Sequence, residues 1–262
     1  AEAFIKTYEE TLAMVKEVEQ LRINPADYAY EITKTGKRDD SVVNHRIYRQ
    51  KQEGLYYVEY HPVGGDANVE HLLSALDYAV TLDQVEARIA PDQSLYFINL
   101  TADEARKIAD LTDDSAINEF RRSVSCVGST VCQIGIQDSN GLLKAIFTHL
   151  EAKGVDTRKL PRLHISGCPH SCGTHQIGEI GFHGSVKLVD KKPTTSFMLV
   201  DGGSEHMGSE NFGKMAGHIV ATKIPEFMEA LANKLNEAPE PDFGTWRLTH
   251  KGEYMELIKA FE

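Results

Sequence analysis

The stretch Leu55-Tyr-Tyr-Val-Glu-Tyr60 opens the part of the chain whose pattern decides the fold. Its aromatic and β-branched residues favour a strand, which Pro62 and the pair Gly64-Gly65 would end. Apolar residues then recur at helical spacing between Val69 and Val80. This spacing predicts a helix that buries one of its faces.

Two further strands and a second helix are expected after this helix. Residues 85–90 and 94–100 are predicted to be strands, with Pro91-Asp92 at the turn between them. The sequence Thr101-Ala-Asp-Glu104 has the form of a capping box, in which the threonine hydroxyl and the glutamate carboxylate bind free backbone N–H groups at a helix start. The order β-α-β-β-α is most of a ferredoxin-like α+β unit, which we place at residues 54–115.

The residues before this unit are expected to form a helix and a connection. Apolar residues lie three or four positions apart near the start of the chain, as on one face of a helix: Ile5, Tyr8, Leu12, Val15 and Val18. This helix is predicted to end near Asn24-Pro25. Residues 33–52 are rich in charge and show little apolar periodicity, so they are predicted to be a long connection or extended arm. Together these features assign residues 1–53 to an N-terminal helix and connecting arm.

The chain from residue 116 to 262 is richer in glycine and is expected to be a second, mixed α/β subdomain. A helix is predicted at residues 139–153, and a second begins with Pro225 in its first turn. The closing segment, residues 246–261, ends in a third helix. Strands are predicted at residues 162–166, 179–189 and 196–200. The predicted fold class is therefore α+β, with a ferredoxin-like subdomain followed by the mixed α/β subdomain.

The composition of the chain argues against nucleic-acid-binding and membrane-spanning proteins. The 262 residues include 28 basic and 39 acidic side chains, so the net charge is 28 − 39 = −11. An acidic chain without a block of lysine and arginine is not expected to bind nucleic acid. No run approaches the roughly 20 apolar residues of a membrane helix, and no signal peptide is recognisable, so a cytoplasmic protein without a membrane partner is expected.

The four cysteines form two pairs, Cys126-x5-Cys132 and Cys168-x3-Cys172, separated by 35 residues. In a chain of this size without secretory features, such pairs are more typical of metal binding than of disulfides. Four thiolates can bind either a tetrahedral zinc ion or a [4Fe-4S] cluster. The wide first pair favours the cluster. Glycines 128, 135, 167 and 173 would allow backbone to approach it closely.

Two zinc sites remain as alternatives. One uses the four cysteines, as in a zinc-stabilised interaction domain that would lose its fold on chelation. The other is a mixed Cys/His site that would use Cys168, His170, Cys172 and His175. This second site would leave the first cysteine pair without a role.

The second cysteine motif carries a resemblance to a known family. Ile165-Ser-Gly-Cys-Pro-His-Ser-Cys-Gly173, preceded by the Cys-x5-Cys pair and followed by Ile180-Gly-Phe-His-Gly184, resembles the cluster-binding, C-terminal half of the sirohaem-containing nitrite and sulfite reductases. The family pattern is C-x5-C, then G-C-P-N-x-C, then I-G-x-x-G. Residues 57–111 also resemble the ferredoxin-like subdomain that precedes the cluster region in each half of those enzymes. The resemblance spans residues 54–250.

The resemblance implies both cofactors and a reaction. A [4Fe-4S] cluster would be held by Cys126, Cys132, Cys168 and Cys172, and the Cys172 thiolate would also reach the iron of sirohaem. The cluster would pass electrons to sirohaem for the six-electron reduction of sulfite to sulfide or of nitrite to ammonia. Cofactor contact is implied at three further residues, Gly167, His170 and Arg122. His170 stands where the family usually has asparagine. Arg122 would suit the carboxylates of sirohaem, although a solvated surface pair with Arg121 is an equal alternative.

The chain matches only the second of the two related halves of those enzymes. The basic residues that bind the anionic substrate lie in the first half, so the catalytic residues cannot be assigned here. We therefore expect a fragment of a longer polypeptide or a half-size subunit. The implied partners are the N-terminal half or a partner subunit, an electron donor such as ferredoxin or a flavoprotein, and sulfite or nitrite. The alternative function is an iron–sulfur electron-transfer module without sirohaem or reductase activity of its own.

Overall fold

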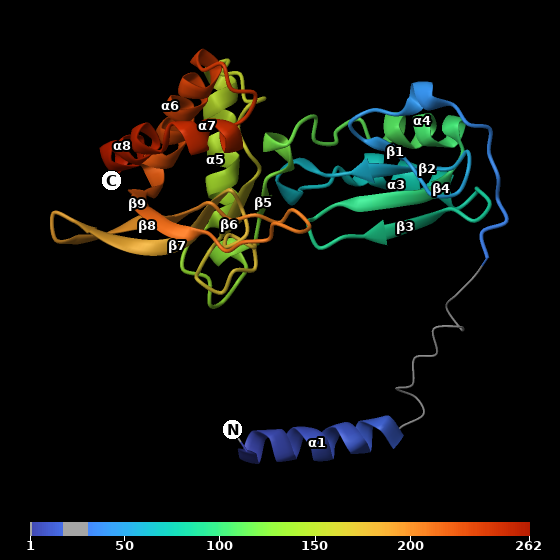
Figure 1. Ribbon diagram of the computed structural model, residues 1–262, viewed down its shortest axis with the longest axis horizontal. Helices are drawn as coiled ribbons and strands as arrows, with labels where there is room; N and C mark the ends of the chain where they lie inside the picture. Colours follow the sequence, from blue (N-terminus) through green and yellow to red (C-terminus); the bar gives the residue numbers. More distant parts are fainter. Residues whose placement is uncertain (1, 18–30) are drawn as a thin grey trace. The chain divides into compact units, whose positions relative to one another are not determined.

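The computed structural model describes residues 2–17 and 31–262 of the chain (Figure 1). The chain divides into two units, residues 1–34 and 35–262. The first unit contains helix α1 (Glu2–Glu17), on which Phe4, Ile5 and Tyr8 are exposed. The helix predicted from the apolar spacing is confirmed. Its last apolar position, Val18, and its predicted end near Asn24-Pro25 lie outside the described residues.

The second unit begins with a four-stranded antiparallel sheet. Its strands are β1 (Ile47–Arg49), β2 (Tyr56–Tyr60), β4 (Leu95–Leu100) and β3 (Glu86–Ile89), in that order across the sheet. Helices α3 (Val69–Ala79) and α4 (Ala102–Leu111) bury small residues against it, so Ala75 and Ala105 share a core with Val58 and Phe97. The predicted β-α-β-β-α order is confirmed. The predicted cap is present too, since the Thr101 N–H donates to the Glu104 carboxylate at 2.8 Å.

Most of residues 33–52, predicted to be a connection, has no regular structure, but residues 47–49 join this sheet. This stretch contains a short 3-10 helix, η2 (Asp40–Val42), and strand β1, which pairs with β2 through Ile47 and Val58. Val42 and Ile47 are both buried. The prediction missed this strand, because a three-residue strand among charged residues is too short to show periodicity. Strand β1 supplies the fourth strand, which the usual β-α-β-β-α-β order would place after α4.

The second sheet has five strands in the order β5 (Val124–Ser125), β6 (Leu163–Ser166), β7 (Ile180–Val189), β8 (Lys192–Asp201) and β9 (Lys214–Val220). The first three are parallel and the last three antiparallel. The three predicted strands are confirmed, although β8 begins four residues earlier than expected. Strands β5 and β9 were not predicted. The first has only two residues, and the second contains Gly217 and His218, which weaken its apolar alternation.

Helices cover one face of the second sheet (Figure 1). They are α5 (Ser139–Ala152), α6 (Ile224–Glu237), α7 (Phe243–Thr249) and α8 (Lys251–Phe261). Pro225 lies in the first turn of α6, as predicted. The core beneath them contains Phe182, Phe197 and Trp246, and it is separate from the core of the first sheet. Short 3-10 helices complete the unit: η3 (Val63–Gly65), η4 (Phe120–Arg122), η5 (Gly128–Thr130) and η6 (Ala221–Lys223).

Among residues 2–17 and 31–262, no helix combines the length and the apolar character needed to cross a bilayer.

Candidate metal centre

The four cysteines line one cavity. Cys126 directly follows β5, and Cys132 lies in the loop between β5 and α5. Cys168 and Cys172 lie in the loop that follows β6. Because β5 and β6 are parallel neighbours, their carboxyl ends meet at the same edge of the sheet, where α/β folds commonly bind ligands. Cys168 is buried, Cys172 is exposed and the other two are half-buried, and all four are free thiols.

Backbone hydrogen bonds join the two cysteine loops. The Cys126 N–H donates to the Ile165 carbonyl at 3.0 Å, which continues the pairing of β5 with β6. The N–H groups of Ile136 and Gln137 both donate to the Gly167 carbonyl, at 3.1 and 2.8 Å. These bonds fix the two loops to each other, so the separation of the sulfurs is set by backbone rather than by mobile side chains.

The glycines of these loops are required by the packing of one loop on the other. A Cβ atom at Gly167 would lie 2.6 Å from the Gln137 carbonyl oxygen, and one at Gly173 would lie 2.0 Å from that of Ile165. Gly128 has φ +66°, in the left-handed region, and Gly135 lies against the backbone of Ser129. The nearest atoms in each case are protein backbone, so the glycines serve loop packing, a role that the sequence did not indicate.

Two of the sulfurs have hydrogen-bond partners in the part of the chain that the structure describes. The Gly167 N–H donates to Cys126 Sγ at 3.1 Å, and Ser139 Oγ lies at the same distance from that sulfur. Cys168 Sγ lies 3.3 Å from Nδ1 of His170, an exposed side chain at the cavity. N–H and O–H donors aimed at sulfur stabilise the thiolate, which is the form that binds metals.

The cysteine sulfurs lie farther apart than the four ligands of a single zinc ion do. A zinc ion with Zn–S bonds of about 2.3 Å holds tetrahedral sulfurs about 3.8 Å apart. Within residues 2–17 and 31–262, no three cysteine or histidine ligand atoms near the cavity lie within 4.8 Å of one another. His175, the fourth residue of the mixed Cys/His alternative, binds Ser166 Oγ through Nδ1 at 2.9 Å and does not line the cavity. In the described residues, neither zinc alternative has its ligand atoms gathered as one tetrahedral ion would hold them.

The structure brings Gly167 and His170 to the cysteine cavity, but not Arg122. Arg122 forms ion pairs with Glu59 on β2 and with Glu119, and it lines a different cavity. Arg121 pairs with Glu151, and its guanidinium lies 4.7 Å from the centre of the Phe147 ring. Both arginines therefore have partners within the protein.

A second group of potential ligands lies beside Arg122, and the sequence did not reveal it. The ligand atoms of Glu59, His61 and Asp92 lie within 4.8 Å of one another. Burial lowers the pKa of His61 to about 4 and raises that of Glu59. However, Glu59 is paired with Arg122, and Asp92 with Arg162 at 3.0 Å. Because both carboxylates already have guanidinium partners, the group is a charge-compensated network rather than a cation site.

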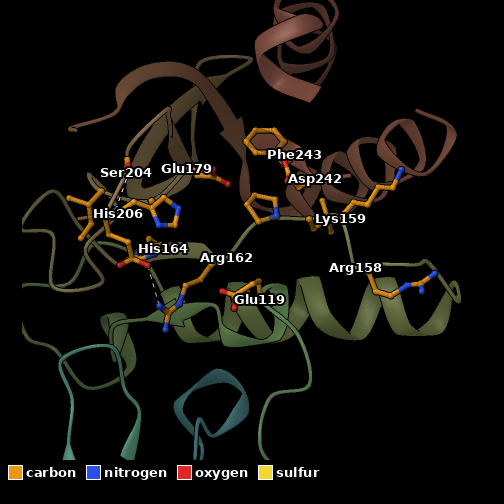
Figure 2. Close-up of a pocket in the computed structure, with 15 residues that line it drawn as sticks. Glu119, Arg158, Lys159, Arg162, His164, Glu179, Ser204, His206, Asp242 and Phe243 are labelled. Atoms are coloured by element: carbon orange, nitrogen blue, oxygen red, sulfur yellow. Dashed lines mark hydrogen bonds and ion pairs between the residues drawn. The ribbon is translucent and has the colours of Figure 1, made fainter. Parts of the chain in front are cut away.

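A larger cavity of about 280 Å³ has mixed charge (Figure 2). Both basic and acidic side chains line it, among them Arg162, His164, Glu179 and His206. Arg162 is paired with Glu205 at 3.3 Å in addition to Asp92, and burial lowers the pKa of His164 to about 4. The cavity has no cysteine in its lining, and its acidic and basic side chains are nearly balanced in number.

Comparisons with known proteins find reductases similar to this chain. The chain is 26% identical over 193 residues to ferredoxin–nitrite reductase of Synechococcus elongatus. The matched region covers 71% of this chain and 37% of that protein. It is 28% identical over 124 residues to the sulfite reductase [NADPH] hemoprotein beta-component of Lysinibacillus sphaericus, covering 43% of this chain and 22% of that protein. No protein-family model matches the chain.

A solved structure shares the fold. The Mycobacterium tuberculosis NirA protein superposes with a TM-score of 0.62 at 20% identity, over 79% of this chain and 40% of that protein. This likeness supports the α+β fold predicted from the sequence. The chain spans 37% or less of the length of the two curated relatives above.

Proposed function

Because this chain belongs to the nitrite and sulfite reductase family, we propose that it is the cluster-binding part of such an enzyme. In this proposal a [4Fe-4S] cluster is held by Cys126, Cys132, Cys168 and Cys172. The observation that carries the proposal is the convergence of all four sulfurs on one cavity at the carboxyl ends of β5 and β6. Four thiolates from two loops are the usual ligand set of such a cluster.

We assign the thiolate shared with sirohaem to Cys172. This residue is the exposed one of the four cysteines, so a second group can approach its sulfur from outside the cavity. His170 and Gly167 lie on the same cavity and are the proposed cofactor contacts of this loop. When bound, the cluster and sirohaem supply electrons one at a time to a substrate atom, as a six-electron reduction requires.

Exposed apolar side chains beside the cysteines support the proposal that another group covers this surface. Val127, Val131, Ile134 and Ile136 are 58, 74, 65 and 46% exposed, and all four belong to the loop between β5 and α5. Adjacent exposed apolar residues mark interaction sites more often than free surface. We infer that this apolar rim, residues 127–136, contacts the macrocycle and the part of the enzyme that lies beyond this chain.

The proposed reaction is the reduction of sulfite to sulfide or of nitrite to ammonia. Electrons would come from a donor such as ferredoxin or a flavoprotein. The cations that stabilise an anionic substrate would come from the N-terminal half or a partner subunit, because the arginines near the cysteine loops, Arg121 and Arg122, are already paired. The proposed compartment is the cytoplasm, where thiols stay reduced.

Anaerobic purification with iron, sulfide and zinc analysis and a visible spectrum tests the proposal. We expect about four irons per chain, and a macrocycle band after supply of sirohaem. Cys172→Ser should lose the macrocycle band and most of the iron. Ser74→Ala, at an exposed position on α3 that does not line the cysteine cavity, is the control and should retain both.

One zinc ion per chain and no iron would contradict the proposal. A stable cluster that binds no sirohaem even when the N-terminal half or partner subunit is supplied would contradict the reductase assignment and leave an electron-transfer module.

A further inference from the structure

The hydroxyl of Ser139 lies beside the sulfur of Cys126. Ser139 is the first residue of α5 and is completely buried. Its Oγ donates to the Cys126 carbonyl at 2.8 Å and lies 3.1 Å from Cys126 Sγ. The hydroxyl has one proton, so it can donate to only one of these two atoms at a time, and the sulfur is a proposed cluster ligand.

The surrounding backbone is shaped to admit this hydroxyl. A Cβ atom at Gly128 would lie 2.9 Å from Ser139 Oγ and 2.7 Å from Ser139 N. Only glycine combines that space with the φ of +66° at this position. The side chain of Asp138, the residue before Ser139, caps α5 by accepting from the Gly141 N–H at 2.8 Å. Capping is thus provided by Asp138, which leaves the Ser139 hydroxyl free to bind Cys126.

The charge of the sulfur decides which acceptor the hydroxyl prefers. A thiolate has no proton, so Cys126 Sγ can only accept hydrogen bonds when it binds iron. Hydrogen bonds to a charged acceptor are about twice as strong as those to a neutral one. An added electron on the cluster increases the negative charge on its sulfur ligands. The Ser139 hydroxyl should therefore stabilise the reduced state more than the oxidised state.

We propose that Ser139 is a positioning residue that raises the reduction potential of the cluster by donating a hydrogen bond to Cys126 Sγ. This inference rests on the proposed function. In the step concerned, one electron from an external reductant enters the cluster, no covalent bond forms or breaks, and the hydroxyl keeps its proton. Hydrogen bonds to sulfur ligands are among the factors that set cluster potentials. The Gly167 N–H supplies a second donor to the same sulfur, so Cys126 has the strongest donor environment among the four described sulfurs.

The test is a redox titration of the iron-loaded chain, followed by electron paramagnetic resonance. Ser139→Ala should bind the same amount of iron but shift the midpoint to a more negative potential. The shift should correspond to a loss of about three- to tenfold in the equilibrium constant for reduction, because only part of one charge-assisted hydrogen bond differs between the two states.

Ser123→Ala is the matched control. Ser123 is equally buried and its Oγ also makes two hydrogen bonds, donating to the Phe120 carbonyl and accepting from the Leu163 N–H, but it does not line the cysteine cavity. Its loss should lower the free energy of unfolding and leave the potential unchanged. Ser139→Thr, which keeps a hydroxyl, should keep the wild-type potential.

An unchanged midpoint in iron-loaded Ser139→Ala would overturn the inference, as would an equal shift in Ser123→Ala. If Ser139→Ala does not hold iron, Ser139→Gly removes the same hydroxyl, and an unchanged potential there overturns the inference equally. A wild-type chain that binds no iron would instead contradict the proposed function. The two failures are therefore distinguishable.

Discussion

The guanidinium of Arg122 forms an ion pair with the carboxylate of Glu59, and this pair joins the two sheets. Arg122 ends the 3-10 helix that leads into β5, whereas Glu59 belongs to β2 of the first sheet. The Glu59 side chain is only 4% exposed. A buried carboxylate without a partner is costly, so the pair couples the cysteine-bearing sheet to the ferredoxin-like unit.

Arg122→Met should therefore destabilise the protein. Removing the cation leaves Glu59 buried and unpaired, or forces it to bind a proton, and we expect a loss of about 3 kcal/mol in the free energy of unfolding. Denaturant unfolding measures it. Arg158→Met, which removes an exposed pair with Asp156, is the control and should have little effect.

The same variant also tests the predicted contact of Arg122 with sirohaem. If Arg122 serves only Glu59 and Glu119, folded Arg122→Met should bind sirohaem as well as the wild type does in the same titration. A clear loss of sirohaem affinity in the folded variant would instead support the contact expected from the sequence.

Stability should fall on acidification between pH 6.5 and 4. Burial lowers the pKa of His61 to about 4 from an ordinary value of 6.5. Between pH 6.5 and 4 the unfolded chain therefore binds a proton at His61 that the folded chain does not bind. The contribution of neutral His61 to the free energy of unfolding is complete above pH 6.5 and is lost as the pH falls toward 4. His164 behaves in the same way.

His61→Gln should reduce the slope of unfolding free energy against pH in this window. Ser74→Ala, which changes an exposed side chain that does not titrate, is the control and should leave the slope unchanged. The carboxylate of Asp156, whose pKa is lowered to about 2 mainly by the side chain of Arg158, contributes only at lower pH. A slope in His61→Gln equal to the wild-type slope would show that His61 does not titrate in this way.

Gly173→Ala should disrupt the second cysteine loop. A methyl group there would lie 2.0 Å from the Ile165 carbonyl oxygen, a contact with backbone that no side-chain rotation can relieve. We expect iron binding to weaken by about ten- to a hundredfold, as when a supporting residue of a metal site is lost. Gly252→Ala, where a methyl group meets nothing within 4 Å, should bind iron normally. Equal iron contents in the two variants would contradict this account of the loop.

Particular residues show why the sequence revealed some features and not others. The cysteine cavity was predictable because each cysteine pair is local in sequence and follows or precedes a recognisable strand or helix. The partner of Arg122 was not, because Glu59 lies 63 positions away and only the packing of two sheets brings them together. Strand β1 was missed because Ile47 is the only buried residue of its three. Its assignment depends on hydrogen bonds to β2 rather than on its own pattern.

His170→Asn separates the cluster assignment from the mixed Cys/His alternative. His170 stands where the resembling family usually has asparagine, and its Nδ1 lies 3.3 Å from Cys168 Sγ. If the imidazole only donates a hydrogen bond to that sulfur, an asparagine amide can replace it. Iron content and the visible spectrum of the cluster should then match the wild type.

His170→Leu supplies the second half of this test. It removes the donor without offering another, so it should retain iron but shift the cluster potential to more negative values, since hydrogen bonds to sulfur help to set that potential. If instead both variants lose their metal, His170 is a metal ligand, and the ligand set includes its imidazole. Metal analysis of the two variants beside the wild type decides between a donor and a ligand, because only a ligand is required for the metal to be retained.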